Sequence, residues 1–137
     1  MSDIGFTAVL PEGWPRPRGY AQGVVTAGGR VLRVAGQTGV APGAHHVAPD
    51  ADFGAQFTQA LANVAAVVQA AGGKAEHIVS LRAYLTDVGD FNAHGAAVGA
   101  AWGASLGRHF PAMTIVGVTA LLDPAARVEI EAEAVLP

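Results

Sequence analysis

Cysteine, charge and above all positive charge are scarce in this sequence of 137 residues. The absence of cysteine excludes disulfides, a thiol nucleophile and thiolate metal sites. Charged residues make up 14% of the chain, where an ordinary soluble domain has roughly 25%. A small chain with so few charges has a large surface and little to keep it soluble. This shortage favours burial of part of the surface against further copies of the same chain.

Eight Lys and Arg residues stand against 11 Asp and Glu residues, which gives a net charge of −3. A protein that binds nucleic acid needs a basic stripe to neutralise phosphates. No segment of this sequence concentrates its few cations in that way. We therefore expect no nucleic-acid partner.

Membrane and secretion signals are also missing. Residues 53–73 carry no charge over more than the ~18 residues that indicate a membrane span, but Gln56, Gln59 and Asn63 interrupt the stretch. The N-terminal residues lack a cationic start followed by an apolar run. We expect a cytoplasmic protein with no membrane partner, folded as one domain over 1–137 with a lead segment at 1–18.

Residues 53–71 have the pattern of an amphipathic helix. Asp50 or Asp52 can serve as the N-cap, and Gly72 with Gly73 as the stop. Amide side chains on another side of the helix predict a polar face. The apolar residues recur at the helical interval, at Phe53, Phe57, Leu61, Val64, Val68 and Ala71.

A second helix is predicted over 91–106, with Asp90 as its cap. Its shared face contains Phe91, Gly95, Val98, Gly99, Trp102 and Leu106. Two glycines on the packing side would let this helix approach its neighbour closely. Each glycine costs ~1 kcal/mol against alanine in a helix interior, so tertiary packing has to stabilise this helix.

Strand signals occur at 23–27, 30–37, 78–85, 114–121 and 127–135, with the first two joined as a hairpin across Gly28 and Gly29. Strands and helices in this order predict an α+β fold with helices on one face of the sheet.

The last strand, 127–135, alternates between apolar and charged residues. Val128, Ile130 and Ala132 share one side, and Arg127, Glu129, Glu131 and Glu133 share the other.

The charged side of this last strand has two interpretations. The carboxylates are either a solvated face or part of a site. Arg127 lies two residues from Glu129 on the same side, which favours an ion pair between them.

Common catalytic motifs do not account for this chain. The G-x-S-x-G match around Ser105 lies at a predicted helix end, and no His follows Asp123 to complete the Ser-Asp-His order that such a triad needs. The five histidines have no metal-ligand spacing, and we expect them in loops or on the surface, with no metal site.

Several short pieces in order resemble the RidA/YjgF family of imine and enamine deaminases over about residues 19–135. No piece is specific alone, but their order and spacing are. The pieces are Ala35-Gly36-Gln37 at a strand end, 52–63 and 70–72 at the two ends of the first helix, 84–91, Phe110-Pro111-Ala112 before a strand, and 128–132.

The resemblance implies a chorismate-mutase-like α+β sandwich, with one mixed sheet, two helices on one face, and a homotrimer with an inner barrel. It further implies ligand clefts between subunits and hydrolysis of short 2-imino acids to 2-keto acids and ammonia without a cofactor. In the family pattern Glu129 matches the residue that positions the attacking water, and Tyr20 matches a cleft tyrosine. Substrate-binding positions would be Ala35, Gly36, Gln37, Phe91, Met113 and Ile115.

Met113 departs from the family pattern, which has an arginine there to bind the substrate carboxylate. A thioether cannot make the two charge-assisted bonds of a guanidinium. Together with Ile115 and Gly117 it predicts an apolar cleft floor that favours a neutral or bulkier substrate. Cations that could replace the arginine are Arg33, Arg82, Arg108 and Arg127.

Two hypotheses about function remain open at this point. The first is a hydrolase of an imine, enamine or related C–N bond that uses Glu129 and Tyr20. The second is a non-catalytic trimer that binds a small ligand in the same inter-subunit cleft, with Met113 as core filling.

Overall fold

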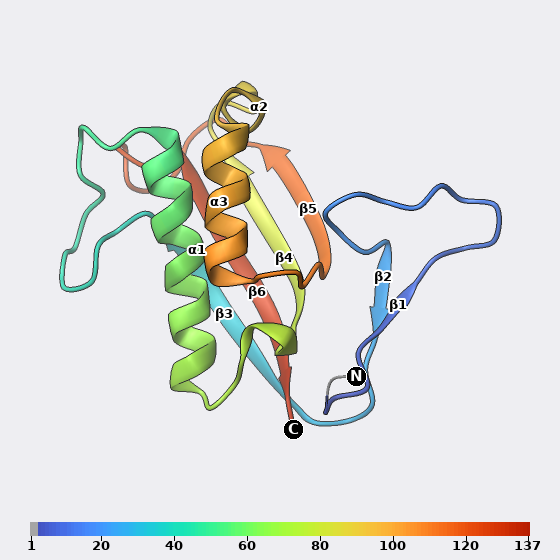
Figure 1. The fold of residues 1–137 in the computed structure, drawn as a ribbon. Coiled ribbons are helices and arrows are strands. Elements are labelled where there is room, and N and C mark those ends of the chain that lie inside the picture. Colours follow the sequence, from blue (N-terminus) through green and yellow to red (C-terminus); the bar gives the residue numbers. More distant parts are fainter. Residues whose placement is uncertain (1–2) are drawn as a thin grey trace.

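A mixed sheet of four strands forms the centre of the computed structural model, which describes residues 3–137. The strands lie in the order β3-β6-β4-β5 (Figure 1). The parallel pair is β4 with β5, and the other neighbours are antiparallel. Their bounds are Arg30–Thr38 for β3, Ile78–Leu85 for β4, Ala112–Gly117 for β5 and Val128–Leu136 for β6.

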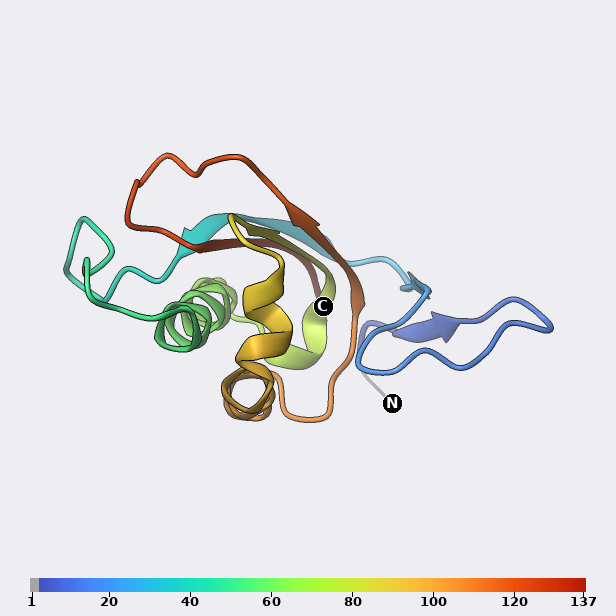
Figure 2. The same cartoon turned by 90° about the horizontal axis from the view of Figure 1, so that it is seen from above.

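Helices cover one face of this sheet (Figures 1 and 2). These are α1 (Phe53–Ala70), the short α2 (Gly89–Ala93) and α3 (Gly95–Ser105), and a 3-10 turn, η1 (Ala75–His77), follows α1. Phe53 and Phe57 of α1 are fully buried against the sheet. The predicted α+β class, with a mixed sheet and helices on one face, is confirmed.

The predicted cap and stop of the first helix are confirmed. Asp52 Oδ1 accepts a hydrogen bond from the backbone N–H of Ala55 at 2.8 Å. The helix ends at Ala70, and Gly72 follows with φ 87°, a conformation that glycine adopts without strain.

The predicted polar face of α1 is partly buried and hydrogen-bonded to backbone. Gln56 is 1% exposed, and its amide donates to Ala51 O at 3.0 Å and Ala125 O at 3.1 Å. Asn63 donates to Thr38 O and Val40 O. The amides therefore connect the helix to flanking loops, because a buried amide is stable only when it is hydrogen-bonded.

The predicted second helix is broken in two. His94 has φ −112° and ψ 32°, and it separates α2 from α3. Asp90 is not the cap, because α2 begins one residue earlier and Asp87 Oδ1 accepts the N–H of Gly89 at 2.9 Å. Asp90 is instead buried and paired with Arg127.

The glycines of α3 also differ from their predicted role. A Cβ built on Gly95 or Gly99 would meet nothing within 4 Å, so neither brings two helices together. The close approach occurs at Gly54 of α1, where a Cβ would lie 2.9 Å from Cβ of Ala97 in α3. The contact between these helices depends on a glycine of the other helix.

The predicted hairpin across Gly28 and Gly29 is wrong. β2 (Gly23–Val25) pairs with β1 (Thr7–Val9), and β3 pairs with β6. Gly28 and Gly29 have φ values of 64° and 96°, and a Cβ on Gly29 would overlap Leu136 O. These glycines direct the chain past the end of β6. Figure 2 shows the β1–β2 pair standing away from the main sheet.

The later strands follow the prediction more closely. The predicted alternation of β6 is confirmed, since Val128, Ile130 and Ala132 are at most 2% exposed. β5 is shorter than predicted and ends at Gly117. Among residues 3–137, no helix is long and apolar enough to cross a membrane.

Candidate functional site

A pocket of about 660 Å³ opens between α3, β5 and the segment before β2. It contains four of the eight predicted site residues, Tyr20, Phe91, Met113 and Ile115. The remaining lining residues are Arg18, Gly19, Val98, Gly99, Trp102, Gly103, Gly107 and Phe110. Most of these side chains are apolar, and Gly117 of the predicted cleft floor is not among them.

The sheet register explains why the β5 residues face this pocket. Met113 pairs with Leu81 and Ile115 with Ala83, and both β4 partners point into the core beneath the helices. Met113 packs against the core cluster, while Ile115 is 36% exposed. The thioether and the isoleucine therefore form a floor on the helix-covered side of the sheet.

The opposite wall depends on a short contact at the edge of β5. The backbone N–H of Ala21 donates to Pro111 O at 3.0 Å, and Ala21 forms a parallel bridge with Ala112. This bridge places the preceding Tyr20 at the pocket. Gln22 Nε2 lies 3.5 Å from the Tyr20 hydroxyl and can donate to it.

An aromatic pair forms another part of the wall. The rings of Trp102 and Phe110 are stacked, with centroids 6.0 Å apart and an interplanar angle of 10°. Trp102 Nε1 donates to His109 O at 3.1 Å, so its one donor is already used. The pair offers a flat apolar surface.

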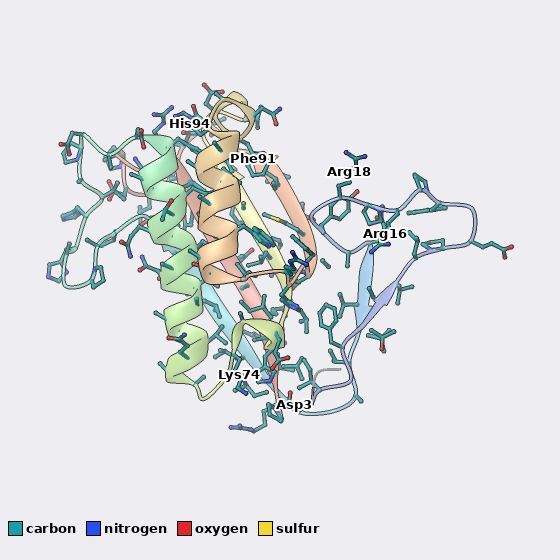
Figure 3. All side chains as sticks on the ribbon, in the orientation of Figure 1. Asp3, Arg16, Arg18, Lys74, Phe91 and His94 are labelled. Carbon is teal, nitrogen blue, oxygen red and sulfur yellow. The ribbon has the colours of Figure 1, made fainter. Side chains whose placement is uncertain are left out.

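Arg18 is the one charged residue of the pocket lining in the described part of the chain, and it was not among the expected cations. None of Arg33, Arg82, Arg108 and Arg127 lines the pocket. Within residues 3–137, Arg18 has no hydrogen bond or ion pair. Figure 3 shows it on the loop beside β5, across from Phe91. Arg16 and Arg18 alternate with prolines in this segment, a pattern that matches no motif for a ligand site.

Glu129 lies on the other face of the sheet. It pairs in register with Tyr84 of β4 and Thr38 of β3, whereas its neighbours Val128 and Ile130 point into the core. Beside it, β3 has a bulge between Val34 and Gln37. A Cβ on Gly36 would overlap the Glu129 carboxylate, with Cδ at 2.8 Å. The other predicted residues, Ala35, Gly36 and Gln37, are therefore beside Glu129.

The carboxylates of β6 are not equivalent. Glu133 pairs with Arg33 at 2.6 Å, and Glu131 accepts from Arg82 Nε at 2.9 Å and from the Tyr84 hydroxyl. The Glu129 carboxylate has no hydrogen bond or ion pair among residues 3–137. Glu131 and Glu133 thus form the charged surface of one interpretation. The Glu129 carboxylate is unpaired and is the one that fits the other interpretation, part of a site.

The pKa values on this face follow its hydrogen bonds. The bond from Tyr84, followed by that from Arg82, holds the pKa of Glu131 below its usual range. The same bond to Glu131 raises the pKa of Tyr84. Both shifts stabilise a charged Glu131 and a neutral Tyr84 near neutral pH.

The expected ion pair between Arg127 and Glu129 is wrong. The Arg127 guanidinium binds both oxygens of Asp90, at 2.6 and 2.7 Å from Nη2, and its backbone N–H donates to Gln56 Oε1 at 2.8 Å. Asp90 and Gln56 draw Arg127 toward the helices. This leaves Glu129 free while fixing the backbone immediately before it.

The predicted site residues therefore form two groups on opposite faces of one sheet. One group, with Tyr20, lines the apolar pocket to which the unpredicted Arg18 also belongs, and the other contains the free Glu129 carboxylate beside Gly36. A carboxylate of this kind can move a proton to or from water. No group of three or more His, Asp or Glu residues that could hold a metal occurs in the described chain.

Comparison with known proteins gives a consistent result. A family model described as Endoribonuclease L-PSP matches residues 15–136. The chain is 40% identical over 119 residues to the 2-iminobutanoate/2-iminopropanoate deaminase of Escherichia coli K12, covering 85% of this chain and 86% of the relative.

Solved structures agree with this. A protein of unknown function of the conserved Rid family from Yersinia pestis matches with TM-score 0.80 and 31% identity, over 97% of this chain and 100% of that one. The YjgF gene product of E. coli matches with TM-score 0.65 and 37% identity, over 94% and 98% of the two chains.

Proposed function

Because the chain belongs to the RidA/YjgF family, whose model is described as Endoribonuclease L-PSP, we propose that it hydrolyses the C=N bond of an imine, or of the imine formed from an enamine, in a small metabolite. The observation that carries the proposal is the free Glu129 carboxylate beside Gly36. Its two neighbours on β6 are occupied by ion pairs and cannot take the same role.

In the proposed reaction the oxygen of a water molecule bonds to the imine carbon while Glu129 accepts a proton from that water. Glu129 then returns the proton to the nitrogen, which gives a carbinolamine. In a second transfer Glu129 takes the proton of the new hydroxyl group and passes it to the nitrogen, the C–N bond breaks, and ammonia and a carbonyl product are released. A positioned carboxylate contributes ~10²–10⁴-fold to such proton transfers. Tyr20 orients the nitrogen or the water through its hydroxyl.

The substrate differs from the short 2-imino acids named for the E. coli relative. Met113 stands where the family pattern has its carboxylate-binding arginine, and it packs into an apolar floor. Removal of one partner of such a buried pair costs ~2–5 kcal/mol in binding. We therefore propose a bulkier substrate that does not place a carboxylate against the pocket floor.

The two groups of site residues meet only if two copies of the chain contribute. Glu129 and Met113 face opposite sides of one sheet, so the pocket of one copy would receive Glu129 of the next. Exposed apolar side chains on the sheet, such as Val31 and Val116, and the low charge content support self-association. We propose the homotrimer with an inner barrel that the family pattern implies. Light scattering tests it, and a monomer of 13.8 kDa would contradict it.

The test of the chemistry compares two carboxylates of one strand. Imines are generated in situ from a panel of amino acids by an amino-acid oxidase, and their decay is followed by absorbance. Glu129→Gln is expected to lower kcat/KM by about 100-fold or more, because the proton acceptor is lost. The matched control Glu133→Gln removes a paired carboxylate and is expected to retain most activity. Full activity in Glu129→Gln would exclude the mechanism.

The alternative is a non-catalytic trimer that binds a small ligand in the same cleft. It predicts no turnover of any imine, together with thermal stabilisation by a ligand. Turnover that requires Glu129 would rule it out.

A further inference from the structure

We propose that the pocket between α3 and β5 binds a large, flat apolar group of the substrate, and that Arg18 binds the substrate carboxylate at its rim. The inference rests on the proposed function for the identity of the reacting group, and on the geometry of the pocket for everything else. It assigns the substrate class as imines of aromatic amino acids.

The pocket is large enough to hold an aromatic ring. At about 660 Å³ the cavity lies within the ~300–1,000 Å³ typical of sites for ligands much larger than a four-carbon acid. A short substrate would leave apolar walls without contacts, and dispersion attraction is lost wherever a gap remains. A ring-bearing side chain fills the space.

The pocket walls are open on one side and flat on another. α3 presents Gly99 and Gly103 to the pocket, and a Cβ on either would meet nothing within 4 Å. The stacked rings of Trp102 and Phe110 provide a flat surface beside this opening. Aromatic groups prefer offset or edge contacts with such rings, which adds to the area they bury.

The pocket lining has little charge. Among the lining residues that the structure describes, Arg18 carries the one formal charge, and no carboxylate occupies its guanidinium. Met113 puts no cation on the pocket floor, whereas Arg18 adds one to the lining and is itself exposed to solvent. A substrate would therefore insert its apolar end and leave its carboxylate near solvent.

The experiment measures binding without turnover, by calorimetry with keto-acid products. Phenylpyruvate is expected to bind about tenfold or more tightly than 2-oxobutanoate, because it buries a ring. Gly99→Leu fills the pocket and is expected to abolish this preference. Gly95→Leu is the matched control, since Gly95 also meets nothing within 4 Å but does not line the pocket. Equal binding of both acids, or an unaltered preference in Gly99→Leu, would overturn the pocket assignment.

Arg18 is tested with a neutral analogue. Arg18→Gln is expected to weaken phenylpyruvate by about three- to tenfold, as an exposed charge contact does, and to leave phenylacetone unchanged. Equal weakening of both ligands would overturn the role of Arg18. Failure of the proposed hydrolysis is distinguishable, because it would appear as absent turnover while these binding differences persist.

Discussion

α1 and α3 lie side by side over the same face of the sheet, but they use their small and polar residues in opposite ways (Figure 1). Gly54 of α1 is buried against Ala97, whereas Gly99 of α3 faces open space. The amides of Gln56 and Asn63 in α1 are occupied by backbone carbonyls, whereas α3 between Gly95 and Ser105 contains no amide. Small and polar residues of α1 thus serve packing, while glycines of α3 leave space on the pocket wall.

The largest effect is expected from the buried amide of α1. Gln56→Leu leaves Ala51 O, Ala125 O and the N–H of Arg127 without their partner. Each unsatisfied buried group costs ~1–3 kcal/mol, so we expect a loss of about 3 kcal/mol or more in the free energy of unfolding. Urea denaturation measures it. Gln69→Leu, at an exposed position of the same helix, serves as control and is expected to change stability by less than ~0.5 kcal/mol.

A smaller loss is expected at the contact between the helices. Gly54→Val forces side-chain atoms into Ala97, and overpacking of this kind costs ~1–3 kcal/mol. Thermal unfolding of Gly54→Val and Gly99→Val separates the two environments. If both variants lost the same stability, the contrast between the helices would be wrong.

The smallest effect has the opposite sign. Gly99→Ala is expected to raise the free energy of unfolding by about 0.5–1 kcal/mol, because alanine favours the helix and its methyl group meets nothing. The same denaturation series measures this gain. A loss of stability would show that α3 needs its glycine for packing.

Local patterns predicted some elements well and others poorly. α1 and the strand Ile78–Leu85 follow from hydrophobic periodicity and capping residues within one segment. The break at His94 and the pairing of Thr7–Val9 with Gly23–Val25 depend on contacts made elsewhere in the chain. Periodicity carries no information about those contacts.

The residues of the candidate site could be predicted from the sequence, but their arrangement in space could not. Resemblance selected Tyr20, Met113 and Glu129, yet the register of β4, β5 and β6 puts Glu129 on the other side of the sheet from Met113. Arg127 pairs with Asp90 and not with Glu129, which lies two residues away in the sequence. This pairing depends on the position of α2, which the sequence does not show. Arg18 was missed because the segment Pro15-Arg16-Pro17-Arg18 matches no motif for a ligand site.

Gly36 has a consequence for how such a protein can change over evolutionary time. A methyl group there would displace the flexible carboxylate of Glu129 without meeting rigid backbone, so the fold would tolerate it easily. The substitution would move the carboxylate that we propose as the proton acceptor while leaving the glutamate itself in the sequence. Under the proposed mechanism, catalysis can therefore be lost in a relative that still has the glutamate. Position 36 has to be inspected together with position 129 when relatives of this chain are compared.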